Sequence, residues 1–142
     1  MESIHHVVGI GRVYENMGEV IRLMSDGECF LMHKDGWEKG TKVRGEWEGE
    51  YESLLVRKEG TLYRKGTCSK GKLNGKTFES LSMLKEDIDH QYTITLDGYF
   101  INGQKEGPFI EITKYHKTQF LEYFSVLYEQ GNEVSRCQIE SH

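Results

Sequence analysis

Glycines recur along this chain with a fixed spacing. Three triplets share a separation of five and then four residues: Gly40, Gly45 and Gly49; Gly66, Gly71 and Gly75; and Gly98, Gly103 and Gly107. An aromatic residue follows the last glycine of each triplet, at Tyr51, Phe78 and Phe109. The triplets begin 26 and then 32 residues apart, a period typical of a stack of equivalent supersecondary units.

Each triplet also has the composition of a tight turn. Glycine reaches positive φ without a clash at Cβ, and asparagine tolerates the same region. Segments 70–75 and 102–107 have this composition, and Asn102-Gly103 is the strongest hairpin signal in the chain. Further turns are expected at 25–27, 34–36, 58–60 and 130–132. The sequence therefore predicts an all-β fold, an antiparallel meander of about nine to eleven strands in glycine-turned hairpins.

Apolar and polar residues alternate in the strands that this fold requires. Tyr92, Ile94 and Leu96 share one face of segment 91–97, as in a half-buried strand. Segment 120–128 also fits helical spacing; we favour a strand, with a short C-terminal helix capping the sheet as the alternative. Pro108 predicts that its strand lies at an edge or begins there. No linker divides the chain, so we expect one domain over residues 1–142.

The glycine triplet, the Asn-Gly-Gln-Lys-Glu-Gly turn at 102–107 and the aromatic residue after it resemble MORN repeats, especially the variant in bacterial proteins often labelled antitoxin-like. The resemblance covers approximately residues 40–131 and is best over 98–111. It implies an elongated single-layer sheet, open or curled, that serves as an interaction platform rather than an enzyme. The chain departs from the pattern at Thr67-Cys68, where Tyr99-Phe100 stands in the better copy.

Composition narrows the class of partner and the compartment. The net charge of −5 disfavours binding to nucleic acid, because such binding neutralises phosphates with Lys and Arg. Apolar runs fall short of the ~20 residues that a membrane helix needs, and the N-terminus does not have the pattern of a secretory signal. We therefore expect a cytoplasmic protein without a membrane span. Three widely spaced cysteines, Cys29, Cys68 and Cys137, predict reduced and mostly buried thiols.

The most distinctive chemical feature is a strip of alternating glutamates, Glu46, Glu48, Glu50 and Glu52. An unbroken strand would place all four carboxylates on one face, whereas a turn at 45–49 would divide them between adjacent strand ends. The strip is either a landing patch for a basic partner or a solvated face paired with Lys39, Lys42, Arg44 and Arg57. With Trp37, Trp47 and Tyr51 it forms the candidate partner-binding site.

Aromatic residues give a second lead: Trp37, Trp47, Tyr51, Tyr63, Phe78, Tyr92, Tyr99, Phe109, Tyr123 and Tyr128. They either fill the core of a closed or two-layer sheet or line an exposed face that a partner covers.

Three other motifs give weaker indications of function. The acidic cluster at 86–90 has too few spaced carboxylates for a calcium loop. His5 and His6 are adjacent, so on a strand they point to opposite faces and do not chelate. Residues 7–11 begin like a dinucleotide loop, but Tyr14 occupies the third glycine position. We expect no catalytic residue, cofactor or metal.

The sequence thus predicts a non-enzymatic interaction protein, an inhibitor or antitoxin-like factor of bacterial or phage origin, with a basic or neutral protein partner. The alternatives are a small-molecule or nucleotide-binding protein that sequesters its ligand, and a structural homo-oligomer.

Overall fold

A computed structural model describes residues 4–9, 12–15, 27–83 and 90–141, with side chains described over 27–83 and 90–139. The described chain is almost entirely antiparallel β-structure and contains no α-helix, as the glycine pattern predicted. The described residues form twelve strands. They are β1 (Ile4–Gly9), β2 (Arg12–Glu15), β3 (Gly27–His33), β4 (Gly36–Val43), β5 (Glu46–Val56), β6 (Gly60–Ser69), β7 (Lys72–Leu73), β8 (Gly75–Met83), β9 (Tyr92–Ile101), β10 (Gln104–Tyr115), β11 (Leu121–Glu129) and β12 (Asn132–Ser141).

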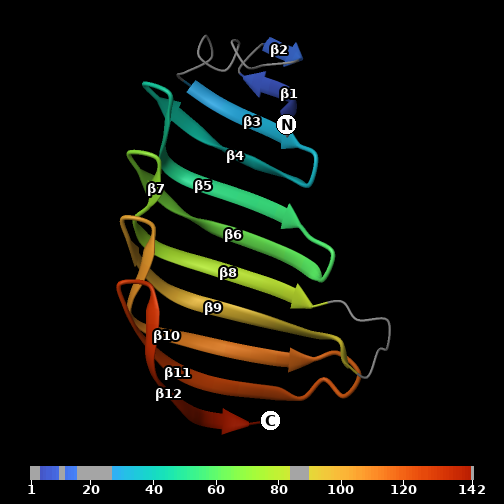
Figure 1. Ribbon diagram of the computed structural model, residues 1–142, viewed down its shortest axis with the longest axis vertical. Helices are drawn as coiled ribbons and strands as arrows, with labels where there is room; N and C mark the ends of the chain where they lie inside the picture. The colour runs from blue at the N-terminus through green and yellow to red at the C-terminus, as the bar shows by residue number, and fades with distance from the viewer. Residues whose placement is uncertain (1–3, 10–11, 16–26, 84–89, 142) are drawn as a thin grey trace.

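The strands form one open sheet. Its order is β12-β11-β10-β9-β8-β6-β5-β4-β3-β1-β2, with the short β7 paired to β6. The strands are stacked along the long axis of the molecule as successive hairpins in a single layer (Figure 1). Segment 120–128, which also fitted a helix, forms strand β11, so the helical alternative is wrong.

Four hairpin turns repeat the same backbone geometry. Arg44, Lys70, Asn102 and Gln130 have φ between 50° and 55°, and the glycine after each has φ between 81° and 86°. Two consecutive residues with positive φ define the type I′ turn, whose twist matches that of the flanking strands. The predicted turns at 70–75, 102–107 and 130–132 are therefore confirmed.

Each of the last three of these turns also contacts the preceding one. The N–H of Gly71 donates to the Trp47 carbonyl at 3.0 Å, that of Gly103 to Leu73 at 2.8 Å, and that of Gly131 to Lys105 at 2.9 Å. The acceptor always lies two residues after the glycine of the preceding turn. The turns consequently form a hydrogen-bonded column along one side of the sheet (Figure 1).

The first glycine of each triplet has a different role, which is to admit a neighbouring side chain. A Cβ at Gly98 would lie 2.5 Å from the Phe109 ring, one at Gly66 would lie 2.6 Å from Thr77 Oγ1, and one at Gly40 would lie 2.8 Å from the Glu50 carbonyl oxygen and 3.1 Å from the Trp47 ring. The Phe109 and Trp47 rings thus lie over the backbone of the adjacent strand. This packing forms the hydrophobic core on one face of the sheet, the core face, with Cys68, Leu73, Phe100, Phe109, Val126 and Tyr128 buried.

Two glutamates, Glu79 and Glu111, also lie on the core face, and each has a hydrogen-bonded partner. Glu79 accepts from Arg64 Nε at 2.6 Å and lies 3.4 Å from Lys105 Nζ. Arg136 binds both oxygens of Glu111, at 2.7 and 3.0 Å. Within the described chain, no buried side-chain nitrogen or oxygen is without a hydrogen bond.

The prediction that Pro108 marks an edge strand or a strand start is wrong. Pro108 lies inside β10, a strand with neighbours on both sides, and not at an edge or a strand start. The pairing of β10 with β9 shifts register between Glu106 and Ile110, which creates a β-bulge around the proline. A bulge tolerates proline because the ladder is already interrupted there.

Candidate functional site

The face opposite the core face, the outer face, carries the candidate site. Successive side chains of a strand point to opposite faces. Buried Cys29, Phe109 and Val126 therefore assign their neighbours Phe30, Ile110 and Leu127 to the outer face. No second layer covers the outer face within the described part of the chain, because all its strands belong to the one sheet.

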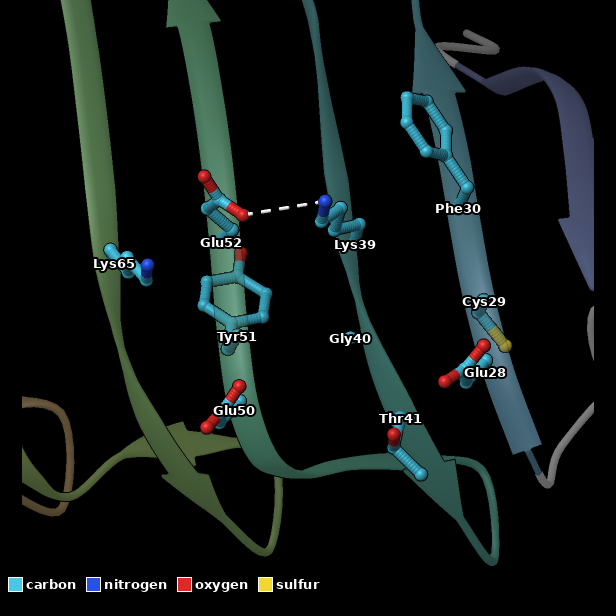
Figure 2. A pocket seen from close by; sticks show the side chains of 10 residues that line it. All are labelled: Glu28, Cys29, Phe30, Lys39, Gly40, Thr41, Glu50, Tyr51, Glu52 and Lys65. Atoms are coloured by element: carbon cyan, nitrogen blue, oxygen red, sulfur yellow. Dashed lines mark ion pairs between the residues drawn. The ribbon is translucent and has the colours of Figure 1, made fainter.

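A shallow hollow of about 450 Å³ lies on this face across β3, β4, β5 and β6. Figure 2 shows the residues around it, and three carboxylates, Glu28, Glu50 and Glu52, face two amines, Lys39 and Lys65. We call this region the acidic hollow. Neither Glu28 nor Glu50 forms an ion pair or hydrogen bond with another described residue, so both carboxylates are available to a positively charged group.

Among the three carboxylates of the acidic hollow, Glu52 is held by contacts with neighbouring side chains. It accepts a hydrogen bond from the Tyr63 hydroxyl and lies 3.6 Å from Lys39 Nζ. The Tyr63 hydrogen bond lowers the pKa of Glu52, opposed by desolvation and aided by Lys39. The same hydrogen bond, with desolvation, raises the pKa of Tyr63 to about 12. Glu52 is thus held ionised and in place.

The structure divides the predicted glutamate strip. All four glutamates belong to β5, but Gly49, with φ 87°, lies where the pairing with β4 shifts register. Glu50 and Glu52 line the hollow, whereas Glu48 accepts from the Lys70 N–H at 3.0 Å and Glu46 lies beside Gly71. The first two glutamates therefore contact the next turn.

The predicted aromatic residues are also divided. Trp47 and Tyr51 pack together on the core face with centroids 5.3 Å apart. Tyr51 donates to Glu38 at 2.8 Å, and burial together with Glu38 raises the pKa of Tyr51. Trp37 lies on the outer face against Phe30, 5.7 Å between centroids. The open single layer excludes the closed or two-layer core that was one expectation for the rings.

Sequence reasoning missed Glu28 and Lys65. They lie 22 residues before and 15 after Glu50 in the sequence, and strand register brings them to the hollow. Among the predicted ion pairs of the strip, Lys39 pairs with Glu52, while Lys42 lies over the Trp47 ring, 4.9 Å from its centroid.

A second feature of the outer face is an exposed apolar area over β8 to β11. Phe78 is 37% exposed, Tyr99 59%, Ile110 45% and Leu127 39%. Phe78 and Ile110 both pair with the exposed Asp97 of the intervening strand β9, and Leu127 pairs with Pro108, two residues before Ile110. We call these four residues the apolar outer patch.

Tyr63 connects the two features. Its hydroxyl binds Glu52 in the acidic hollow, and its ring contacts Phe78 of the apolar outer patch edge-on, 6.5 Å between centroids. Tyr63 therefore joins the acidic hollow to Phe78 on the outer face.

The thiols and histidines do not form a chemical centre in the described residues. Cys29 and Cys68 are buried, Cys137 is exposed, and none of the three forms a disulfide. Burial raises the pKa of Cys29, and that of Cys68 to about 11, so both stay protonated at neutral pH. No group of three His, Cys, Asp or Glu residues is arranged to hold a metal ion in the part described. Residues 86–89 of the acidic cluster and the side chains of His5 and His6 lie outside that part.

Comparisons define no family for this chain: no family model matches it, and neither a curated protein nor a solved structure matches it. In the described residues, no helix has the length and apolar character needed to cross a membrane.

Proposed function

We propose that this chain is a non-enzymatic interaction protein that binds a protein partner on its outer face. The observation that carries the proposal is the apolar outer patch, where a tyrosine, a phenylalanine and two aliphatic side chains are exposed together on an uncovered sheet face. Exposed apolar side chains gathered on one face are a feature of interaction sites, and Tyr and Phe are enriched in interface cores.

The acidic hollow supports a particular chemistry for that partner. Its three carboxylates outnumber its two amines, and Glu28 and Glu50 have no described partner. A lysine or arginine side chain fits this charge, and attraction between unlike charges accelerates encounter more than it strengthens the complex. The partner therefore presents an apolar ridge with a basic group at one end, consistent with a MORN-like interaction platform.

The experiment uses the whole chain as bait, followed by direct binding of the purified, identified partner. Leu127→Glu and Ile110→Glu should each weaken binding at least tenfold, because they bring an unpaired carboxylate into the interface. Val56→Glu is the matched control, since Val56 is 47% exposed, against 45% for Ile110, but lies at the far end of β5. Equal affinity of all three variants for the partner would exclude the apolar outer patch as the binding site.

A double variant tests the acidic hollow separately. Glu28→Gln with Glu50→Gln should lower the association rate and reduce its dependence on salt, with little change in the dissociation rate. An unchanged association rate at low salt would show that no basic group of the partner binds the acidic hollow.

The volume of the acidic hollow supports a second function, binding of a small cationic or zwitterionic molecule. About 450 Å³ lies within the ~300–1,000 Å³ of ligand sites. A panel of such molecules should then raise the melting temperature of the wild type and not that of Lys39→Ala with Glu50→Gln. If no molecule shifts the wild type, this second function fails.

A further inference from the structure

Aliphatic side chains form a row across the core face, away from the turns. Tyr63 belongs to the outer face, so its neighbour Leu62 in β6 belongs to the core face. Leu62 pairs directly with Leu55 of β5 and with Leu81 of β8. Leu81 pairs in turn with Ile94 of β9. Directly paired residues share a face of the sheet, and we call Leu55, Leu62, Leu81 and Ile94 the apolar row.

The described residues place no second layer over the apolar row. All four of its side chains are half-buried, whereas Phe109 and Val126 in the hydrophobic core are fully buried. Every described strand belongs to the one sheet. A sheet with an apolar face is stable when that face packs against another layer. The apolar row therefore needs a second layer that the described chain does not supply.

The adjacent row on the core face carries charges that restrict what this layer is. Arg64 of β6 pairs with Glu79 of β8, and its Nε donates to that carboxylate at 2.6 Å. The Arg64 side chain is partly exposed, and its Nη groups form no ion pair with another described residue. A fitting layer presents a carboxylate to Arg64 and aliphatic side chains beside it. The core face of this same chain has both.

We infer that the second layer is the core face of a second copy of this chain. The twofold axis runs parallel to the strands, midway between β6 and β8 and between the two sheets. It exchanges β6 with β8 and β5 with β9, so each row lies opposite itself. Leu62 then faces Leu81 of the second copy, and Leu55 faces Ile94. Arg64 faces Glu79 of the second copy, and the contact occurs twice because the interface is isologous.

The order of residues along the two rows favours this axis over its neighbours. An axis between β5 and β6 sets Glu38 opposite Glu79, two carboxylates. An axis between β8 and β9 sets Leu55 opposite Glu122. The axis between β6 and β8 matches the whole apolar row with itself and a cation with an anion. Further out it sets Glu38 opposite Glu111, and each of these carboxylates is already hydrogen-bonded within its own chain.

The resulting dimer is a β-sandwich. Sheets that pack in this way lie ~10 Å apart with strand directions within ~30° of each other. Met83, beside the apolar row, then faces Gly60, which has no side chain to oppose it. Both outer faces stay uncovered on opposite sides of the dimer, so each copy keeps its acidic hollow and apolar outer patch. The inference therefore does not depend on the proposed function.

Sedimentation velocity of the whole chain in reducing buffer tests the dimer. The wild type should form a concentration-dependent dimer. Leu81→Glu should sediment as a monomer with unchanged far-ultraviolet circular dichroism, because it sets a carboxylate against Leu62 of the second copy. Leu127→Glu is the matched control on the outer face and should remain dimeric. A wild type that is monomeric at its highest soluble concentration would leave the apolar row to another occupant and overturn the inference, as would wild-type dimer affinity in Leu81→Glu.

Cross-linking tests the axis without a charge in the interface. In a Cys137→Ser background, chains with Leu55→Cys are mixed with chains with Ile94→Cys and treated with a short bis-maleimide. The product should contain one chain of each kind. Either variant alone should give little product, because like residues lie three strand spacings, ~14 Å, apart across the axis. Equal cross-linking of one variant with itself would overturn the arrangement.

The same variants separate this inference from the proposed function. Leu81→Glu should keep the affinity for the outer-face partner while losing the dimer, and Leu127→Glu should do the reverse. Loss of both properties in Leu81→Glu, with the fold intact, would contradict a dimer that leaves the outer faces free.

Discussion

Gly98 of β9 lies directly beneath the aromatic ring of Phe109 of β10. A Cβ at Gly98 would lie 2.5 to 2.6 Å from three atoms of that ring, although its φ is not in the left-handed region. The first glycine of the triplet is therefore required by packing, and the later two by backbone conformation.

Gly98→Ala should lower the free energy of unfolding by about 1–3 kcal/mol, because the added methyl overpacks a fully buried ring. Urea denaturation measures the change. The cost should shrink when Phe109→Leu is present, since the smaller side chain leaves room. An undiminished cost in that background would show that the ring is not the cause.

Gly103→Val should destabilise by about 1–2 kcal/mol or more, because a β-branched residue is strained at φ 85°. The nearest atom to an added Cβ is Lys72 Cβ at 3.8 Å, so crowding is not responsible. Gly103→Asn should cost less, since asparagine tolerates this region. Thermal unfolding compares the two, and equal melting temperatures would contradict the turn geometry.

Acid should weaken the fold partly through Glu52. Its pKa is lowered from 4.5 in the folded chain, so its contribution is full above 4.5 and is lost as the pH falls through the lowered value. Tyr63→Phe removes the main cause of the shift and should flatten this part of the stability profile between neutral pH and pH 3. Glu28→Gln is the control, because Glu28 shares the hollow without that hydrogen bond. Parallel profiles for wild type and Tyr63→Phe would exclude the linkage.

Arg64→Met should destabilise by about 2 kcal/mol, reduced from the ~3–5 kcal/mol of a fully buried pair because Arg64 is partly exposed. The Glu79 side chain is 6% exposed and would keep only Lys105. Adding Glu79→Leu should restore most of the loss, since the buried charge is removed. Chemical denaturation of the two single variants and the double variant completes the cycle, and additive losses would show no coupling.

Thiol labelling should distinguish the three cysteines. Cys137 is exposed and should react within the mixing time of a disulfide reagent at pH 8, whereas Cys68, with its pKa raised to about 11, should react only after unfolding. One fast equivalent in native protein, absent in Cys137→Ser, is the expected result. Two fast equivalents would mean that Cys29 or Cys68 is accessible.

Part of the site could not be found from the sequence. The glutamates of β5 alternate as on one strand face, but the bulge at Gly49 turns Glu46 and Glu48 toward the next hairpin. Trp37 and Trp47 are both on conspicuous strands, yet lie on opposite faces. Glycine spacing alone shows neither where the pairing of two strands shifts register nor which face of each strand is directed into the core.

The sequence by itself determined the hairpins, because a type I′ turn needs positive φ at two successive residues and Lys70-Gly71, Asn102-Gly103 and Gln130-Gly131 supply it locally. Tertiary structure decided which side chains meet. Register between strands brings Glu28 to Glu50 and Tyr63 to Phe78, and the single layer leaves Tyr99 and Leu127 exposed. Turn conformation depends on adjacent residues, whereas register and exposure depend on contacts between distant parts of the chain.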